Sequence, residues 1–126
     1  MRGRYSLSMA ALVMVAATPA LAGQDDPTYA FETTTIDYGT IAHQSDGRRS
    51  FKLKNIGTAP LMILDVVSSC GCVVAQFDRE PVFPGQTVDI RVRYDTARMG
   101  PFTKHVVVKT SGTPAEYRLT IRGTVQ

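Results

Sequence analysis

The chain contains two cysteines, Cys70 and Cys72, separated by a single glycine. Side chains two positions apart lie on the same face of an extended strand, so the two sulfurs could meet each other or one shared ligand. In a flat strand their Cα atoms would be about 6.6–6.8 Å apart. A disulfide instead brings the Cβ atoms to about 3.8 Å. A bridge between Cys70 and Cys72 therefore requires a bend in the chain, which Gly71 would permit.

Three interpretations of this pair are open. Two thiolates on one face could clamp Cu(I), which accepts soft ligands, and this makes Cys70 and Cys72 the candidate metal ligands. The pair could also exchange disulfides with other thiols, although thiol oxidoreductases usually carry Cys-x-x-Cys at the start of a helix. In the third interpretation, the pair shapes a turn between two strands. A disulfide that closes so short a loop adds little stability, so a labile bridge is favoured over a structural one.

Other metal ligands are few. Zinc would need four ligands, and neither His43 nor His105 is spaced as a ligand beside the cysteines. The sequence has no Gly-rich phosphate loop, no nucleophile elbow and no paired His–Glu metal motif. We therefore predict no catalytic residues.

The N-terminus has the pattern of a secretory signal peptide. Arg2 and Arg4 precede a short apolar run over residues 7–18, and a small-x-small cleavage sequence ends at Ala22. The run is shorter than the roughly 20 apolar residues of a membrane span. We expect cleavage after residue 22, a periplasmic or secreted protein, and no membrane span in the mature chain. Export to an oxidising compartment favours pairing of the cysteines.

The mature chain is expected to form one domain. Residues 1–22 would be the signal peptide, residues 23–28 a flexible leader and residues 29–126 the domain. Cleavage leaves 12 of the 14 Lys and Arg residues and all 11 Asp and Glu residues, a net charge of +1. The charge therefore gives little support for a nucleic-acid partner.

Alternation of apolar and polar residues predicts short β-strands with one buried and one exposed face. We expect about seven strands, over residues 28–36, 38–42, 48–55, 61–68, 72–77, 86–95 and 102–125, the last split at Gly112. Regular short strands with turns at this spacing predict an immunoglobulin-like antiparallel β-sandwich. The more apolar segments 61–67 and 106–108 suit strands covered on both sides or strands next to a bulge.

Charged and turn residues give further predictions. Arg91 and Arg93 alternate with two aspartates, which predicts a mixed polar face and not a basic patch. Arg48 and Arg49 follow Asp46-Gly47 and are predicted at a solvated hairpin end. Gly57 and Gly85 are expected to adopt positive φ in turns, with Pro84-Gly85 forming a type II turn.

The order of these motifs resembles the bacterial exported family called domain of unknown function 1573. The resemblance covers about residues 30 to 126. It is carried by Asp37-Tyr38-Gly39, Asn55-Ile56-Gly57, Cys70-Gly71-Cys72, Pro84-Gly85-Gln86 and Gly100-Pro101-Phe102. It implies an immunoglobulin-like sandwich akin to those of cilia- and centrosome-associated domains, and it supplies no established activity. Family members usually have Thr after the second cysteine, where this chain has Val73.

Together these observations predict an exported, non-enzymatic binding or scaffold module of the bacterial envelope. We expect a monomer whose partner is an envelope protein, with no cofactor. The alternative is a Cu(I)-binding or thiol–disulfide exchange protein that uses Cys70 and Cys72.

Overall fold

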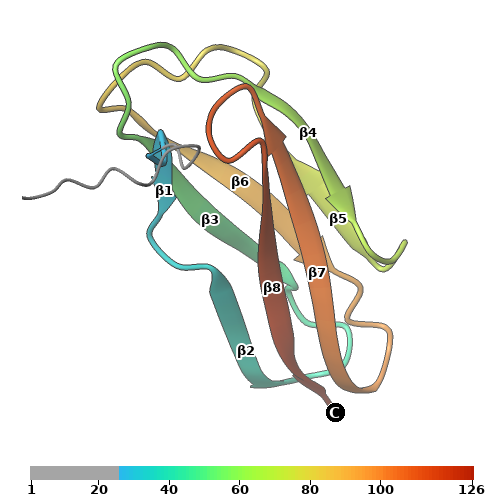
Figure 1. The fold of residues 1–126 in the computed structure, drawn as a ribbon. Coiled ribbons are helices and arrows are strands. Elements are labelled where there is room, and N and C mark those ends of the chain that lie inside the picture. Colours follow the sequence, from blue (N-terminus) through green and yellow to red (C-terminus); the bar gives the residue numbers. More distant parts are fainter. Residues whose placement is uncertain (1–25) are drawn as a thin grey trace, which may run out of the picture.

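The computed structural model describes residues 26–126, so the predicted signal peptide lies outside the described residues. Eight strands form two four-stranded sheets that pack face to face (Figure 1). The strand order is β1-β3-β6-β5 in the first sheet and β2-β8-β7-β4 in the second. The predicted immunoglobulin-like β-sandwich is confirmed. Residues 26–126 include no helix long and apolar enough to cross a membrane.

The strands of the first sheet are β1 (Tyr29–Phe31), β3 (Arg48–Asn55), β5 (Val73–Gln76) and β6 (Thr87–Tyr94). Those of the second are β2 (Thr35–Ile41), β4 (Ile63–Ser68), β7 (Gly100–Thr110) and β8 (Glu116–Val125). Most agree with the predicted ranges to within two residues.

The N-terminal strands differ from the prediction. The sequence predicted a break at residue 37, whereas the chain leaves strand geometry over residues 32–34. The reason is that the chain changes sheets there. β1 pairs antiparallel with β3, and β2 then pairs with β8 in the other sheet. The β2–β8 pairing is parallel, and it is the one parallel pairing among the described strands.

The core lies between the two sheets and follows the alternation along the strands. Phe51 and Leu53 of β3, Ile90 of β6, Val106 of β7 and Leu119 of β8 are fully buried. Each such apolar side chain stabilises the fold by about 1.5–3 kcal/mol relative to an exposed position. Their alternation with polar residues fixes which face of each strand points inward.

The apolar segment 61–67 does not lie between two layers. β4 is an edge strand, and its register with β7 shifts between Ile63 and Asp65. Leu64 is 52% exposed and Val67 is 43% exposed. The expectation of a bulge is therefore confirmed for β4, and the expectation of cover on both sides is wrong there.

The buried Asn55 ties together the loops at one end of the sandwich. Its side-chain amide donates to the carbonyls of Ala59 (2.9 Å) and Val82 (2.7 Å), and its Oδ1 accepts from the Gly57 N–H (2.9 Å). Its backbone N–H donates to the Gln86 carbonyl at 3.0 Å. The Asn-x-Gly and Pro-Gly-Gln motifs therefore meet in one hydrogen-bonded cluster around Asn55, which we call the latch.

The two glycines of this latch differ. Gly85 has φ +85°, and the Gln86 N–H donates to the Phe83 carbonyl at 2.9 Å, so the predicted type II turn is confirmed. Gly57 does not have positive φ, so that prediction is wrong. Close packing accounts for Gly57 instead, because a Cβ there would come within 3.1 Å of the Thr28 Cβ.

Candidate functional site

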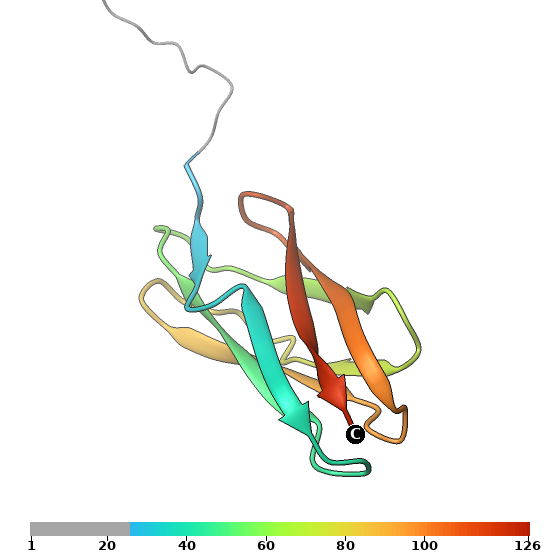
Figure 2. The same ribbon diagram turned by 90° about the horizontal axis from the view of Figure 1, so that it is seen from below.

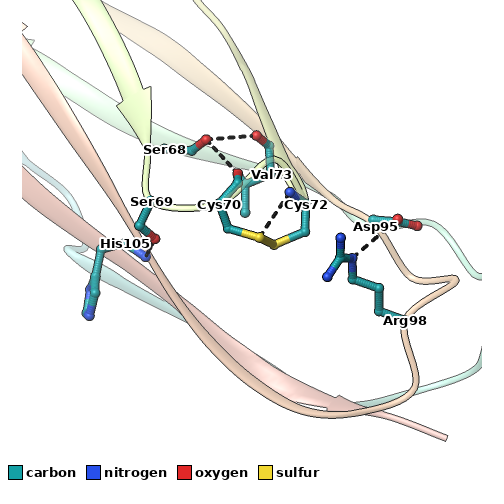
Figure 3. Close-up of a disulfide and its surroundings, with 8 residues drawn as sticks. All are labelled: Ser68, Ser69, Cys70, Cys72, Val73, Asp95, Arg98 and His105. Atoms are coloured by element: carbon teal, nitrogen blue, oxygen red, sulfur yellow. Dashed lines mark hydrogen bonds and ion pairs between the residues drawn. A yellow bond between two sulfur atoms is a disulfide. The ribbon is translucent and has the colours of Figure 1, made fainter.

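Cys70 and Cys72 form a disulfide in the loop that joins β4 to β5 (Figure 3). Figure 2 shows this loop crossing from one sheet to the other at one side of the sandwich. The two Cα atoms are 5.1 Å apart, so the chain bends between them as predicted. Gly71 lies at the exposed bend, but it does not have positive φ, and a Cβ there would meet no atom within 4 Å. Neither the backbone nor the packing therefore requires glycine at this position.

Hydrogen bonds hold the cysteine turn against its neighbours. Ser68 Oγ lies 2.8 Å from the Cys70 carbonyl oxygen and 3.0 Å from that of Val73, and it can donate to either (Figure 3). The Asp95 N–H donates to the Cys72 carbonyl at 2.9 Å. The turn is therefore fixed to the end of β4, the start of β5 and the end of β6.

The two sulfurs differ in exposure. Cys72 is 2% exposed and belongs to the core, whereas Cys70 is partly exposed and packs against the core. The Cys72 N–H donates to Cys70 Sγ at 3.1 Å. One cysteine of the pair is therefore partly exposed and the other is buried. A thiolate from solution would reach the disulfide more readily at Cys70.

The candidate metal ligands and the two histidines are not gathered into one site. Cys70 and Cys72 are joined to each other, and no group of three or more His, Cys, Asp or Glu within residues 26–126 could hold a metal ion. His43 Nε2 lies 3.2 Å from the Ala97 carbonyl, and His105 Nδ1 lies 3.2 Å from Thr120 Oγ1. Cu(I) binding by the cysteines stays a prediction, and it would first require reduction of the disulfide by two electrons.

A basic groove, which the sequence did not predict, lies on the outer face of the first sheet. The register of β3, β6 and β5 places Arg93 between Arg48 and Val74, and Arg91 between Ser50 and Gln76. The hollow has a volume of about 400 Å³. We call it the arginine groove, and it is lined by Arg48, Arg49, Ser50, Val74, Gln76, Arg91, Val92 and Arg93.

The predicted mixed polar face is present, because Asp46 pairs with Arg48 and Asp78 lies near Arg91, but the gathering of arginines in the groove was not predicted. Asp89 lies further along the strand, where its carboxylate pairs with Lys52 at 2.9 Å. Asp95 lies beyond the end of β6. The neighbours of Arg93 are set by pairing across strands, and alternation within one strand does not reveal that pairing.

The arginines of the groove differ in how far they are neutralised. Arg48 makes a two-point contact with Asp46 (2.9 and 3.0 Å), and these hydrogen bonds lower the pKa of Asp46 to about 2. Arg91 lies 3.9 Å from Asp78. Arg93 makes no ion pair with another described residue.

A second hollow joins the arginine groove to the disulfide. It has a volume of about 550 Å³, and its lining includes Gly71 and Cys72 together with residues 44–48 and 93–96. Arg48, Val74 and Arg93 line both hollows. The cysteine turn and the arginines therefore form one continuous candidate site along β5.

The four edge strands are not equally open to a new strand. β1 has three residues, and both β2 and β4 have shifts in their pairing register. The Arg79 side chain also donates to the Leu64 carbonyl of β4 at 3.3 Å. β5 pairs with β6 in unbroken register, and Val74 on its outer face is 49% exposed. Bulges and short length protect edges. β5 is also short, at four residues, and it differs from β2 and β4 in its unbroken register.

Comparison with known proteins identifies the family. The family model described as "Protein of unknown function (DUF1573)" matches residues 29–125. The chain therefore belongs to the DUF1573 family, which confirms the resemblance seen in the sequence. A search of curated proteins finds no match.

Solved structures share the fold. A protein of unknown function from Porphyromonas gingivalis W83 has a TM-score of 0.70 at 18% identity, covering 88% of this chain and 52% of that one. The chain thus spans about half the length of that protein. The ASH/PapD-like domain 7 of human CEP192 has a TM-score of 0.69 at 9% identity, covering 88% and 96%. The Vibrio cholerae VesB protease has a TM-score of 0.59 at 13% identity, covering 79% and 32%. These similarities concern the fold alone.

Proposed function

We propose that this domain is an exported, non-enzymatic binding module of the bacterial envelope that holds an extended segment of a partner protein along β5. The observation that supports this proposal is the open edge of β5 beside a concave surface. An extended peptide can add to such an edge through main-chain hydrogen bonds and place alternate side chains in neighbouring hollows. The half-exposed Val74 offers apolar contact to the same segment.

Position-specific crosslinking in intact cells tests this proposal. A photo-crosslinking amino acid replaces Gln76, which is exposed on β5. The matched control replaces Arg118, which is exposed on β8 in the other sheet. We expect one crosslinked partner of defined mass from position 76 and none from position 118. Equal products at both positions, or none at position 76, would overturn the proposal.

The unequal exposure of the cysteines favours a second candidate function, thiol–disulfide exchange. A thiolate of a partner dithiol would attack Cys70 Sγ, the Cys70–Cys72 bond would break, and Cys72 would leave as a thiolate that takes a proton from water. The second thiolate of the partner would then attack the mixed disulfide and release Cys70. Two electrons would pass from the partner, which is oxidised, to this disulfide, which is reduced.

Single-cysteine variants test this candidate. Cys72→Ala leaves the partly exposed Cys70, and Cys70→Ala leaves the buried Cys72 as the matched control. We expect mixed disulfides to accumulate on Cys72→Ala and not on Cys70→Ala, as measured by mass spectrometry of acid-quenched envelope extracts. Equal amounts on both variants, or none on either, would rule out attack at Cys70.

A further inference from the structure

We infer that the arginine groove binds carboxylate side chains and that the segment held along β5 is acidic, with acidic residues at alternate positions. This inference rests on the proposed function and adds the chemistry of the partner. It is carried by the position of Arg91 and Arg93, by the charge around them and by the open strand edge next to them.

The spacing of the two arginines matches an extended peptide. Arg91 and Arg93 are two positions apart on β6, and both side chains lie on the exposed outer face. Side chains at i and i+2 of a strand point to the same face about 6.6–6.8 Å apart. A partner strand beside β5 has the same repeat, so carboxylates at its positions i and i+2 would lie next to Val74 and Gln76 and would reach across β5 towards Arg93 and Arg91.

Arg93 lies opposite Arg48 and has no carboxylate paired with it among residues 26–126, although Asp46 and Asp95 line the adjoining hollow. Arg48 and Arg93 are direct cross-strand neighbours, and like charges in that arrangement are destabilising. Asp46 contacts Arg48. A carboxylate between the two arginines would relieve their repulsion. A guanidinium binds a carboxylate with two parallel hydrogen bonds, which gives geometric specificity.

Arg91 is also available to a ligand. Its contact with Asp78 is 3.9 Å long, and the two side chains are 47% and 68% exposed. An exposed pair of this kind contributes little, so a better-placed carboxylate could replace Asp78.

A polypeptide fits this surface better than a small anion does. The groove lies directly beside Val74 and Gln76 of the edge strand β5. The Val73 N–H donates to the Cys70 carbonyl (3.2 Å), and the Val73 carbonyl can accept from Ser68 Oγ (3.0 Å). An acidic segment could pair with the remaining outward backbone groups of β5 while its side chains reach towards the arginines. A free anion would interact with the charges of the arginines and would make no main-chain hydrogen bonds to β5.

A peptide-binding experiment tests the inference. The probes are a fluorescent peptide with Glu at alternate positions, the same peptide with Gln in place of Glu, and free glutamate as a competitor. We expect the Glu peptide to bind at least about tenfold more tightly than the Gln peptide, which corresponds to about 1.4 kcal/mol. Binding should weaken as salt concentration rises. Millimolar glutamate should fail to displace the peptide, whereas displacement at that concentration would show a small-anion site and overturn the inference.

Two double variants that lose the same charge distinguish binding in the arginine groove from a general effect of the net charge of the protein. Arg91→Ser with Arg93→Ser should lose the preference for the Glu peptide. Lys109→Ser with Arg118→Ser removes two exposed charges from the other sheet and should retain the preference within about twofold. Equal loss in both double variants would overturn the inference.

The crosslinking experiment distinguishes the two proposals. If position 76 captures a partner equally well with and without Arg91→Ser and Arg93→Ser, the proposed function stands and the acidic partner is wrong. If position 76 captures nothing, the proposed function fails.

Discussion

Two glycines at the same end of the sandwich have different roles. Gly47 is buried, and a Cβ added there would lie 2.2 Å from the Tyr94 carbonyl oxygen. Gly71 is exposed between the cysteines, and a Cβ there would meet no atom within 4 Å. Glycine is therefore required for packing at position 47 and not at position 71.

Alanine substitutions at these two positions test this difference. Gly47→Ala should lower the free energy of unfolding by about 1–3 kcal/mol, because the new methyl group overpacks a closed site. Gly71→Ala should leave it unchanged or raise it by up to about 1 kcal/mol, because the unfolded chain loses freedom. Urea denaturation of both variants gives the comparison. A loss at Gly71→Ala as large as that at Gly47→Ala would show that the cysteine turn depends on glycine.

At the residue scale, local chemistry predicted some features and missed others. The bend between Cys70 and Cys72 and the positive φ of Gly85 follow from the residues themselves. The burial of Cys72 and the crowding at Gly57 depend on atoms from distant parts of the chain. No local pattern marks such contacts.

At the scale of the elements, alternation predicted the strands but not their partners. β3 and β6 were predicted close to their observed ranges. The predicted break at residue 37 was wrong because the sheet change before β2 depends on pairing with β8. The arginine groove was missed for the same reason, since only the register of β3 with β6 brings Arg48 opposite Arg93.

Tyr38 of β2 contacts the loop that precedes β3, and this contact is sensitive to pH. Its hydroxyl donates to the Gly47 carbonyl at 2.8 Å, and its ring packs edge-on against Phe102 with the Arg49 guanidinium 4.2 Å from the ring centre. Burial raises the pKa of the Tyr38 hydroxyl to about 12. The folded protein therefore keeps this proton at a pH where the unfolded chain, with a tyrosine pKa near 10, releases it.

We expect the stability of the domain to fall as pH rises from 10 to 12. Over this range the unfolded state binds fewer protons at Tyr38 than the folded state does, so the free energy of unfolding decreases with pH. Tyr38→Phe should reduce this slope, although burial also raises the pKa values of Tyr29 and Tyr94, which remain. Urea denaturation at several pH values measures the slope. If the free energy of unfolding of Tyr38→Phe had the same slope with pH, the assignment of part of this pH dependence to Tyr38 would be wrong.

At the scale of the whole molecule, the motifs of the family separate into two groups. Asn55-Ile56-Gly57 and Pro84-Gly85-Gln86 form the latch at one end, where turn geometry and hydrogen bonds account for them. Cys70-Gly71-Cys72 lies in the loop that joins β4 to β5, and Gly71 and Cys72 line the hollow beside the arginines. The sequence predicted the sandwich because many strands share one simple pattern. It predicted only the cysteine part of the candidate site, because the rest is assembled from three strands far apart in the chain.

The most direct test of the central claim is to compare all four sheet edges by crosslinking in intact cells. The same photo-crosslinking residue is placed at Ala30 of β1, Thr40 of β2, Leu64 of β4 and Gln76 of β5, each of which is exposed. We predict a product with a distinct partner protein from Gln76 alone. A stronger product from Leu64, a product from Gln76 with the mass of two copies of this chain, or no product from Gln76 would contradict the claim that β5 holds a partner.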